Sequence, residues 1–142
     1  MNVNLFKEQL ISDTGANFAW IEEEQDNPNI TDLSTDLYCR EYRNQISINV
    51  VAFNNGTLFV NFIFGGINFN EDTLRLANNF NSKVQFLKAV VVPARRGHLL
   101  VVQKETNTES VDSAVKEVKD TIEYLMSDDV VKHLQPLDII VG

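Results

Sequence analysis

The stretch ISINVVAFNNGTLFVNFIF, residues 46–64, predicts the central hairpin of a β-sheet. Strong β-formers flank Asn55-Gly56, a dipeptide that readily adopts the positive φ angles of a two-residue type I′ turn. With this loop, Phe53 faces Leu58 across the ladder. One face then carries Val51, Phe53, Leu58, Val60, Phe62 and Phe64, and the other carries Ile46, Ile48, Val50, Phe59 and Ile63. The hairpin is therefore apolar on both faces, whereas a half-solvated antiparallel hairpin is polar on one of them.

The spacing of hydrophobic residues predicts the elements on either side of this hairpin. The expected helices are residues 3–12, 70–83 and 110–126, and the further strands are residues 17–24, 33–42, 86–94 and 98–105. Leu74, Ala77, Phe80 and Val84 form the expected buried stripe of the middle helix. The order α-β-β-β-β-α-β-β-α predicts an α+β fold with an antiparallel sheet packed by helices, because the helices are separated by runs of adjacent strands.

Residues 127–142 extend beyond this pattern. Ser127 and the two aspartates after it can cap a short helix, Val130 to Leu134, and Pro136 is expected to end it because an interior proline removes a backbone hydrogen bond. An apolar tail then follows. No linker or repeat divides the chain, so we expect one domain over residues 1–142, with a core of about 3–126 and an extra C-terminal segment.

Charge and composition narrow the class of protein. The chain has 142 residues and a formal net charge of −8, which disfavours direct binding to nucleic acid or to an anionic membrane. The N-terminus has no basic segment followed by an apolar run, and no stretch is long and apolar enough to span a bilayer. The single cysteine, Cys39, cannot form an intramolecular disulfide. We expect a cytoplasmic protein.

No motif predicts a catalytic residue, a cofactor or a metal. Gly65-Gly66 lacks the lysine and further glycines of a phosphate loop, and acids follow it. His98 and His133 form no ligand pair at helical spacing. Cys39 is expected to be a small buried hydrophobe rather than a nucleophile. The asparagines are scattered, which favours turn chemistry over an amide ladder.

Two charged runs have simple interpretations. Glu22-Glu23-Glu24 is typical of a solvated strand end, since neighbouring residues point to opposite faces of a strand. Arg95-Arg96 is typical of an exposed hairpin turn. We therefore expect a non-enzymatic protein. The alternatives are an enzyme assembled from dispersed carboxylates such as Glu22 and Asp36, or an acidic inhibitor that mimics nucleic acid.

Residues 73–105, TLRLANNFNSKVQFLKAVVVPARRGHLLVVQKE, followed by a helix near Ser110, resemble the YbjN family of bacterial sensory transduction regulators. The matching features are a leucine-rich helix ending in Asn-Phe-Asn, an aromatic residue with Lys-Ala opening a strand, and a hairpin with Gly97, Leu99 and Val101. The resemblance covers roughly residues 3–126. It implies a secretion-chaperone-like fold and a chaperone-like or regulatory binding protein. Members of the family look non-catalytic, so no site residue is carried over.

The two apolar faces of the hairpin predict a protein partner of unknown identity or a homodimer, formed through a sheet face or the apolar tail. Large exposed apolar patches are uncommon on monomers, and two-fold pairing is the commonest way to bury them. The expected interface residues are Ile48, Val50, Phe59 and Ile63. The alternative is a monomer in which the first helix and residues 139–141 fold back over the second face.

Overall fold

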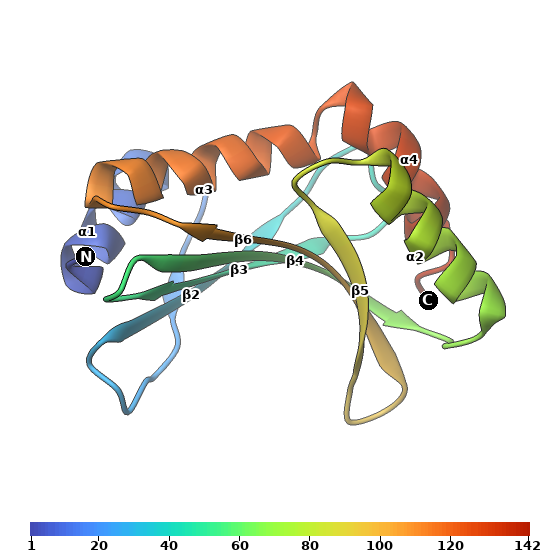
Figure 1. Ribbon diagram of the computed structural model, residues 1–142, viewed down its shortest axis with the longest axis horizontal. Coiled ribbons are helices and arrows are strands. Elements are labelled where there is room, and N and C mark those ends of the chain that lie inside the picture. Colours follow the sequence, from blue (N-terminus) through green and yellow to red (C-terminus); the bar gives the residue numbers. More distant parts are fainter.

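Six antiparallel strands form one sheet, in the order β1-β2-β3-β4-β6-β5, in the computed structural model, which describes residues 1–142 (Figure 1). The strands are β1 Ile21–Glu22, β2 Ile30–Leu37, β3 Ile46–Phe53, β4 Thr57–Ile67, β5 Lys88–Pro93 and β6 His98–Asn107. The helices are α1 Val3–Thr14, α2 Glu71–Lys83, α3 Val111–Leu125 and α4 Asp128–Ile139. The predicted α+β class with a helix-packed antiparallel sheet is confirmed.

All four helices lie on one side of the sheet. Figure 1 shows α3 running along the sheet, with α1 at one end and α2 and α4 at the other. The side chains beneath them form a continuous core to which every helix contributes buried residues, such as Phe6 of α1, Phe80 of α2, Leu125 of α3 and Leu134 of α4. One layer of helices therefore covers one face of the sheet, and the other face has no helix over it.

The ends of α2 and α3 follow from local sequence. Asn70 and Ser110 each accept a hydrogen bond from the backbone of the residue three positions on, which completes a capping box at each N-terminus. This start turns Thr73 inward, so that Thr73 is buried and Leu74 is 42% exposed. The predicted buried stripe of α2 is therefore wrong at Leu74 and right at Ala77, Phe80 and Val84.

The register of the central hairpin differs by one residue from the expected one. Ala52 pairs with Leu58 and Val50 with Val60, which leaves a three-residue turn, Asn54-Asn55-Gly56. The Asn55 side chain closes this turn by accepting a hydrogen bond from the Thr57 amide at 2.9 Å. A one-residue shift moves every side chain of one strand to the opposite face. The inner face accordingly carries only buried apolar residues: Ile46, Ile48, Val50, Ala52, Leu58, Val60, Phe62 and Phe64.

The C-terminal segment belongs to the core. Helix α4 continues through Pro136 to Ile139, so the expectation that Pro136 ends the helix was wrong. Pro136 lies on the exposed side, where water can reach the carbonyl group that its missing N–H would have paired. Leu137 and Asp138, immediately after it, are 1% and 2% exposed, and their burial keeps the chain helical.

The termini do not cover the open face of the sheet. The Thr31 hydroxyl, on the buried side of β2, donates to the Val3 carbonyl of α1, which places α1 on the helix-covered face. Val141 is 5% exposed, and the Gly142 amide donates to the Gly66 carbonyl at 3.0 Å. A Cβ atom added to Gly65 would lie against the Val141 side chain. Val141 therefore packs on the helix-covered side of β4. The alternative in which the termini fold over the second face is therefore wrong.

The predicted strand 33–42 stops early, at Leu37, and the connection that follows it is held by Asp138. Its carboxylate accepts hydrogen bonds from the Arg43 amide at 2.5 Å and from the Asn44 side chain at 2.9 Å. The backbone N–H of Asn44 also donates to this carboxylate, at 3.3 Å. These bonds hold residues 39–45 in an irregular path against α4. The strand expected over 17–24 is also shorter, because only β1 forms there.

None of the helices combines the length and the hydropathy that a bilayer-spanning helix requires.

We predict that Asp138→Ala destabilises the protein by about 1–3 kcal/mol, because it leaves two part-buried backbone N–H groups without an acceptor. Urea denaturation followed by circular dichroism measures the loss. The matched control is Asp129→Ala, an exposed carboxylate of the same helix, for which we expect a change below about 1 kcal/mol. Equal effects of the two substitutions would contradict this role of Asp138.

Candidate functional site

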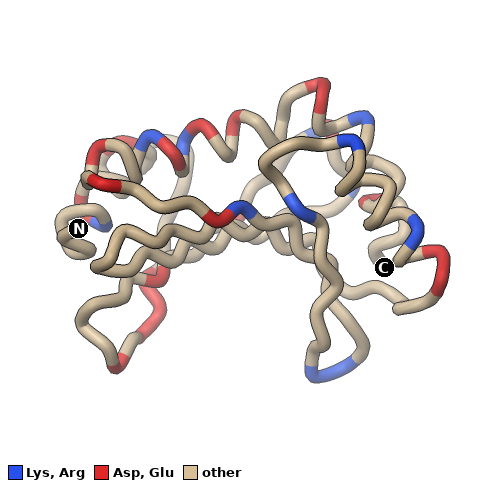
Figure 2. The backbone as a smooth tube through the Cα atoms, viewed as in Figure 1, with Lys and Arg blue, Asp and Glu red and all other residues tan.

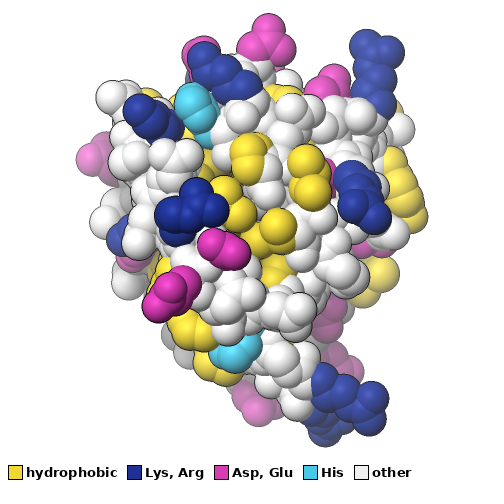
Figure 3. Space-filling model, turned by 90° about the vertical axis from the view of Figure 1, so that its right-hand side faces the viewer, with side chains coloured by type: hydrophobic (Ala, Val, Ile, Leu, Met, Phe, Trp, Pro, Cys, Tyr) yellow, Lys and Arg dark blue, Asp and Glu magenta, His cyan; other side chains and the backbone are white.

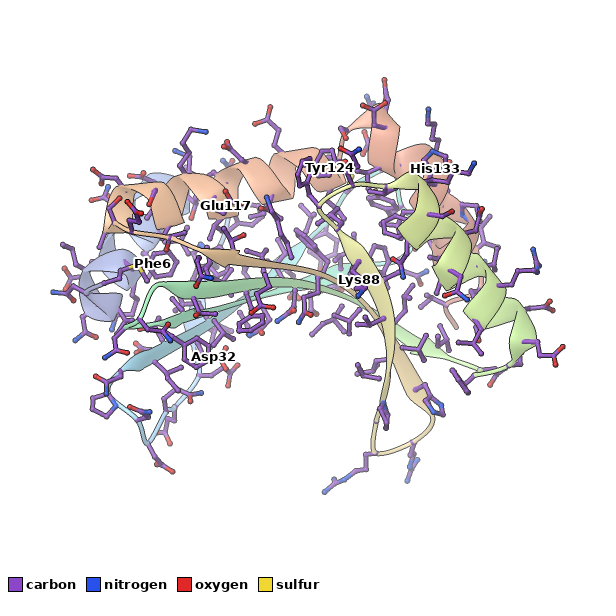
Figure 4. The ribbon with its side chains drawn as sticks, viewed as in Figure 1. Phe6, Asp32, Lys88, Glu117, Tyr124 and His133 are labelled. Atoms are coloured by element: carbon purple, nitrogen blue, oxygen red, sulfur yellow. The ribbon has the colours of Figure 1, made fainter.

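The candidate site is the face of the sheet that has no helix over it, called the open face below. Its side chains alternate along each strand with those of the core and are mostly half-buried. The half-buried members near its centre are Asp32, Ser34, Asn49, Val51, Phe53, Phe59, Asn61, Ile63, Val90 and Gln103. Figure 4 places Asp32 beneath the sheet, with Glu117 on α3 above it. The open face is a broad surface presented by five adjacent strands.

A row of amide side chains crosses the middle of the open face. Asn49, Asn61 and Gln103 occupy directly paired positions on β3, β4 and β6. Gln103 donates to the Asn61 side-chain oxygen at 2.8 Å, and Asn61 donates to that of Asn49 at 3.1 Å. Asn49 in turn donates to the Asp32 carboxylate at 2.6 Å. The expectation that no amide ladder forms was wrong, because the corrected register places these residues opposite one another.

Two groups of apolar side chains flank this amide row. On one side lie Val51, Phe53 and Phe59, with the two rings in an edge-to-face contact at a centroid distance of 5.9 Å. On the other side the pairing of strands aligns Ile63 of β4 with Val101 of β6 and Val90 of β5. The open face thus has an apolar–polar–apolar pattern, with its hydrogen-bonding groups fixed in the centre.

The four predicted interface residues separate into two pairs. Ile48 and Val50 are fully buried beneath the helices and form part of the core. Phe59 and Ile63 lie on the open face, on either side of Asn61. The prediction that all four share one surface was wrong, and its cause is the one-residue error in register. Val51, Phe53 and Val90 are the neighbours that the sequence interpretation missed.

Two segments of opposite charge project from the two edges of the sheet, on the side away from the helices. One is the connection between β1 and β2, residues 23–29, and the other is the turn between β5 and β6, residues 94–97 (Figure 1). Figure 2 shows acidic residues along the first and basic residues at the tip of the second. The acids are Glu23, Glu24 and Asp26, which follow Glu22 of β1, and the bases are Arg95 and Arg96. The acidic segment borders a hollow of about 470 Å³.

Most of the other residues considered for chemistry make contacts within the fold. Gly65-Gly66 lies within β4 at a register irregularity, and α2 begins only at Glu71, so the pair is not placed at a helix N-terminus. His98 stacks on Phe69 at a centroid distance of 4.9 Å, whereas His133 lies on α4 (Figure 4). Of the dispersed carboxylates, Glu22 pairs with Lys7 at 3.1 Å and Asp36 accepts from the Ser47 hydroxyl at 3.3 Å. No group of three or more potential ligands is placed to hold a metal ion.

Cys39 is half-buried and its thiol donates to the Glu41 carboxylate at 2.5 Å. Burial, and then this hydrogen bond, raise the pKa of Cys39 above its ordinary value. The thiol is therefore held protonated, which opposes a role as nucleophile.

A further apolar area lies at the end of the molecule formed by α2, α4 and the β5–β6 hairpin. Figure 3 shows hydrophobic side chains there, surrounded by charged side chains of both signs. Leu74 and Ile139 are 42% and 62% exposed on α2 and α4. This area lacks a fixed hydrogen-bonding row of the kind that crosses the open face.

A two-layer α+β fold, in which one layer of helices covers one face of an antiparallel sheet, is the class of architecture that these observations define. The solved structure of YbjN from E. coli, described as a candidate transcription regulator, has this fold. It matches with a TM-score of 0.57 and 12% sequence identity, over 94% of this chain and 89% of that one. No family model matches the sequence, and no curated protein gives a significant match. The resemblance inferred from residues 73–105 is confirmed for the fold.

We predict that Asn61→Asp lowers the free energy of unfolding by about 1–2 kcal/mol near neutral pH. The carboxylate accepts from Gln103 but cannot donate to Asn49, and it adds a negative charge near Asp32. Urea denaturation measures the free energy of unfolding. The control is Asn78→Asp, which makes the same change at an exposed position of α2. If Asn61→Asp lowers the free energy of unfolding no more than the control does, the amide row contributes nothing to stability.

We also predict that Glu41→Gln speeds alkylation of Cys39 at mildly alkaline pH by about twofold or more, since each 0.3 unit of pKa doubles a small thiolate fraction. Glu41 raises the pKa of Cys39 by its hydrogen bond and its charge, so removing the charge lowers that pKa. Mass spectrometry after timed iodoacetamide treatment measures the rate. The control is Glu109→Gln, an exposed acid after β6. Slower alkylation in Glu41→Gln would contradict the assignment.

Proposed function

We propose that this chain is a non-catalytic protein-binding module that acts through the open face of its sheet, in a regulatory or chaperone-like role. The observation that carries the proposal is the one-sided covering of the sheet. Four helices bury one face, while the other presents two apolar groups and a fixed row of amides with no element of the chain over them. A partly exposed apolar surface that no element of the chain covers is typical of an interaction site.

A protein partner suits this surface better than a nucleic acid or a small molecule. Asp32 lies on the open face and the chain carries a net charge of −8, both of which repel phosphate. Small ligands bind in concave pockets that enclose most of their surface, whereas the open face is a broad sheet surface. Apolar side chains around ordered hydrogen-bonding groups are typical of the centre and rim of a protein interface.

The comparison with YbjN supports the same class of function. That protein is described as a candidate transcription regulator, and its fold spans nearly the whole of this chain. For an acidic chain, a regulatory role is best explained by contact with another protein rather than with DNA. A second copy of the chain and an unrelated protein are both partners of this kind.

We predict that Phe59→Asp or Ile63→Asp abolishes partner binding while the fold is retained. Each substitution places a charge at the centre of the open face, and loss of a central anchor residue costs an interface about 2 kcal/mol or more. Tagged wild-type and variant chains are used as bait in an extract of the native host, and the proteins retained are identified by mass spectrometry. Circular dichroism and thermal unfolding report the fold.

The matched control is Leu5→Asp, which changes a residue that is 48% exposed on α1, on the helix side of the molecule. We expect it to retain the wild-type partner. A partner that binds all variants equally, or one lost with Leu5→Asp and kept with Phe59→Asp, would place the interaction elsewhere and overturn the proposal.

A further inference from the structure

We propose that the open face binds an amphipathic helix of another protein, whose acidic end lies against the Arg95-Arg96 turn and whose basic end lies against the acidic β1–β2 segment. This inference rests on the proposed function, because it uses the same surface. It adds the secondary structure of the bound segment, its direction on the sheet and the charges at its two ends.

The shape of the open face limits the width of what binds there. Figure 1 shows the sheet arched, with the β1–β2 segment and the β5–β6 turn both extending on the inner side of the arch. A flat partner such as a second sheet would meet these segments first and would be kept away from Phe59 and Ile63. A single helix, about 10–12 Å in diameter, is narrow enough to lie between the segments and reach the centre.

The hydrogen bonds of the amide row favour a helix over an extended segment. Each amide of the row already donates to the next polar side chain across the sheet, and the last one donates to Asp32. The row therefore has little capacity to pair the backbone of a partner. An extended chain on this face would bury backbone N–H and C=O groups without partners, which is costly. A helix pairs its own backbone groups and presents only side chains.

Addition of a strand at an edge of the sheet is the weaker alternative. At the β5 edge, the Ala89 N–H donates to the Asn81 side-chain oxygen at 2.7 Å, and the Asn81 side-chain nitrogen donates to the Ala89 carbonyl at 3.0 Å. Pro93, at the end of the same strand, has no N–H to offer. The other edge strand, β1, has only two residues. Neither edge gives a partner strand a continuous row of backbone groups.

The two charged segments lie at opposite ends of the strands as well as at opposite edges of the sheet. The acidic segment precedes Ile30, which pairs with Phe53 at the last position of β3. The basic turn follows Pro93, whose partner His98 pairs with Ile67 at the far end of β4. A helix that joins the two segments therefore crosses the open face diagonally.

The strands also set the length of the helix and the spacing of its apolar residues. The 11 residues of β4 span about 35 Å, a length that a helix of about 23 residues covers. Phe59 and Ile63 are about 13 Å apart along the strand, so apolar side chains about eight positions apart on the helix contact them. Asn61 lies between them and faces a polar side chain about four positions from each.

The charges of the two segments are available to such a helix and determine its direction. Arg95, Arg96, Glu24 and Asp26 are all exposed, and none of the six ion pairs within the chain includes them. Acidic side chains stabilise the first turn of a helix and basic side chains the last, so the N-terminus lies at the basic turn. Exposed ion pairs contribute little affinity singly, but complementary charges fix orientation.

The probes that test this inference are three synthetic peptides of about 23 residues with one common centre. The centre has leucines at the positions that face Phe59 and Ile63, and a glutamine halfway between them. The mixed-end peptide has glutamates in its first turn and lysines in its last turn. The acidic-end and basic-end peptides have glutamates or lysines, respectively, at both ends. Fluorescence anisotropy measures binding with the chain at up to about 0.5 mM, and circular dichroism measures the helix content of the bound peptide.

We expect the wild-type chain to bind the mixed-end peptide, as a helix, about tenfold more tightly than either of the others. A nitroxide spin label on the acidic end should broaden the NMR signals of residues 94–97 and not those of residues 23–29. Ile63→Asp should lose the mixed-end peptide, whereas Leu5→Asp should keep it.

Arg95→Glu/Arg96→Glu makes both projecting segments acidic, so this variant should prefer the basic-end peptide. The matched control is Lys83→Glu/Lys132→Glu, which makes the same change of charge at exposed positions of α2 and α4. The control should keep the preference for the mixed-end peptide. Circular dichroism and thermal unfolding report whether each variant is folded.

The inference is overturned if the mixed-end peptide does not bind, if the three peptides bind equally, or if the spin label broadens residues 23–29 instead. The same holds if Arg95→Glu/Arg96→Glu keeps the wild-type preference, or if the control loses it. If no peptide binds but Phe59→Asp still loses a protein partner in the host extract, the inference fails while the proposed function stands.

Discussion

The pairing of Ala52 with Leu58 determines which residues are inside this protein. With that register, every second residue of β3 and β4 is apolar and faces the helices, and eight side chains at the centre of the sheet are at most 3% exposed. A shift by one residue would bring Asn49 or Asn61 under the helices, where an amide without a partner costs on the order of 1–3 kcal/mol. The same register places Phe59 and Ile63 outside. The composition of the core and that of the open face are thus two consequences of one pairing.

The C-terminal helix fixes this arrangement from the far end of the chain. Asp138 binds the backbone at residues 43 and 44, just before β3 begins, and the Tyr42 hydroxyl donates to the Leu125 carbonyl at 2.5 Å. Burial is the main cause that raises the pKa of Tyr42, so this hydroxyl remains a donor throughout the physiological range. These contacts join segments more than eighty residues apart. They are long-range polar bonds in a core that is otherwise held by apolar burial.

Periodicity predicted most of the elements, because alternation within strands and the helical spacing of α1, α2 and α3 are local properties of the sequence. It failed where contacts between distant parts of the chain determine the length of a turn or the end of a helix. The Asn55-Gly56 signal is equally compatible with a two-residue or a three-residue turn, and only the packing of both strands against the helices selects the second. Pro136 ends a helix by local rules, yet the burial of Leu137 and Asp138 overrides them. Of the candidate site, Phe59 and Ile63 were predicted, whereas the amide row was missed because its members are spread over residues 49 to 103.

The amide row explains how an open apolar face can be compatible with a stable free chain. Side-chain amides that already bond one another across three strands lose little when a partner excludes water, because their main hydrogen bonds persist. In the free protein the same groups interrupt what would otherwise be a continuous apolar surface, which lowers the tendency to aggregate. An all-valine row would bind more strongly and less selectively. The row therefore favours a partner that aligns its own polar groups with the centre of the sheet.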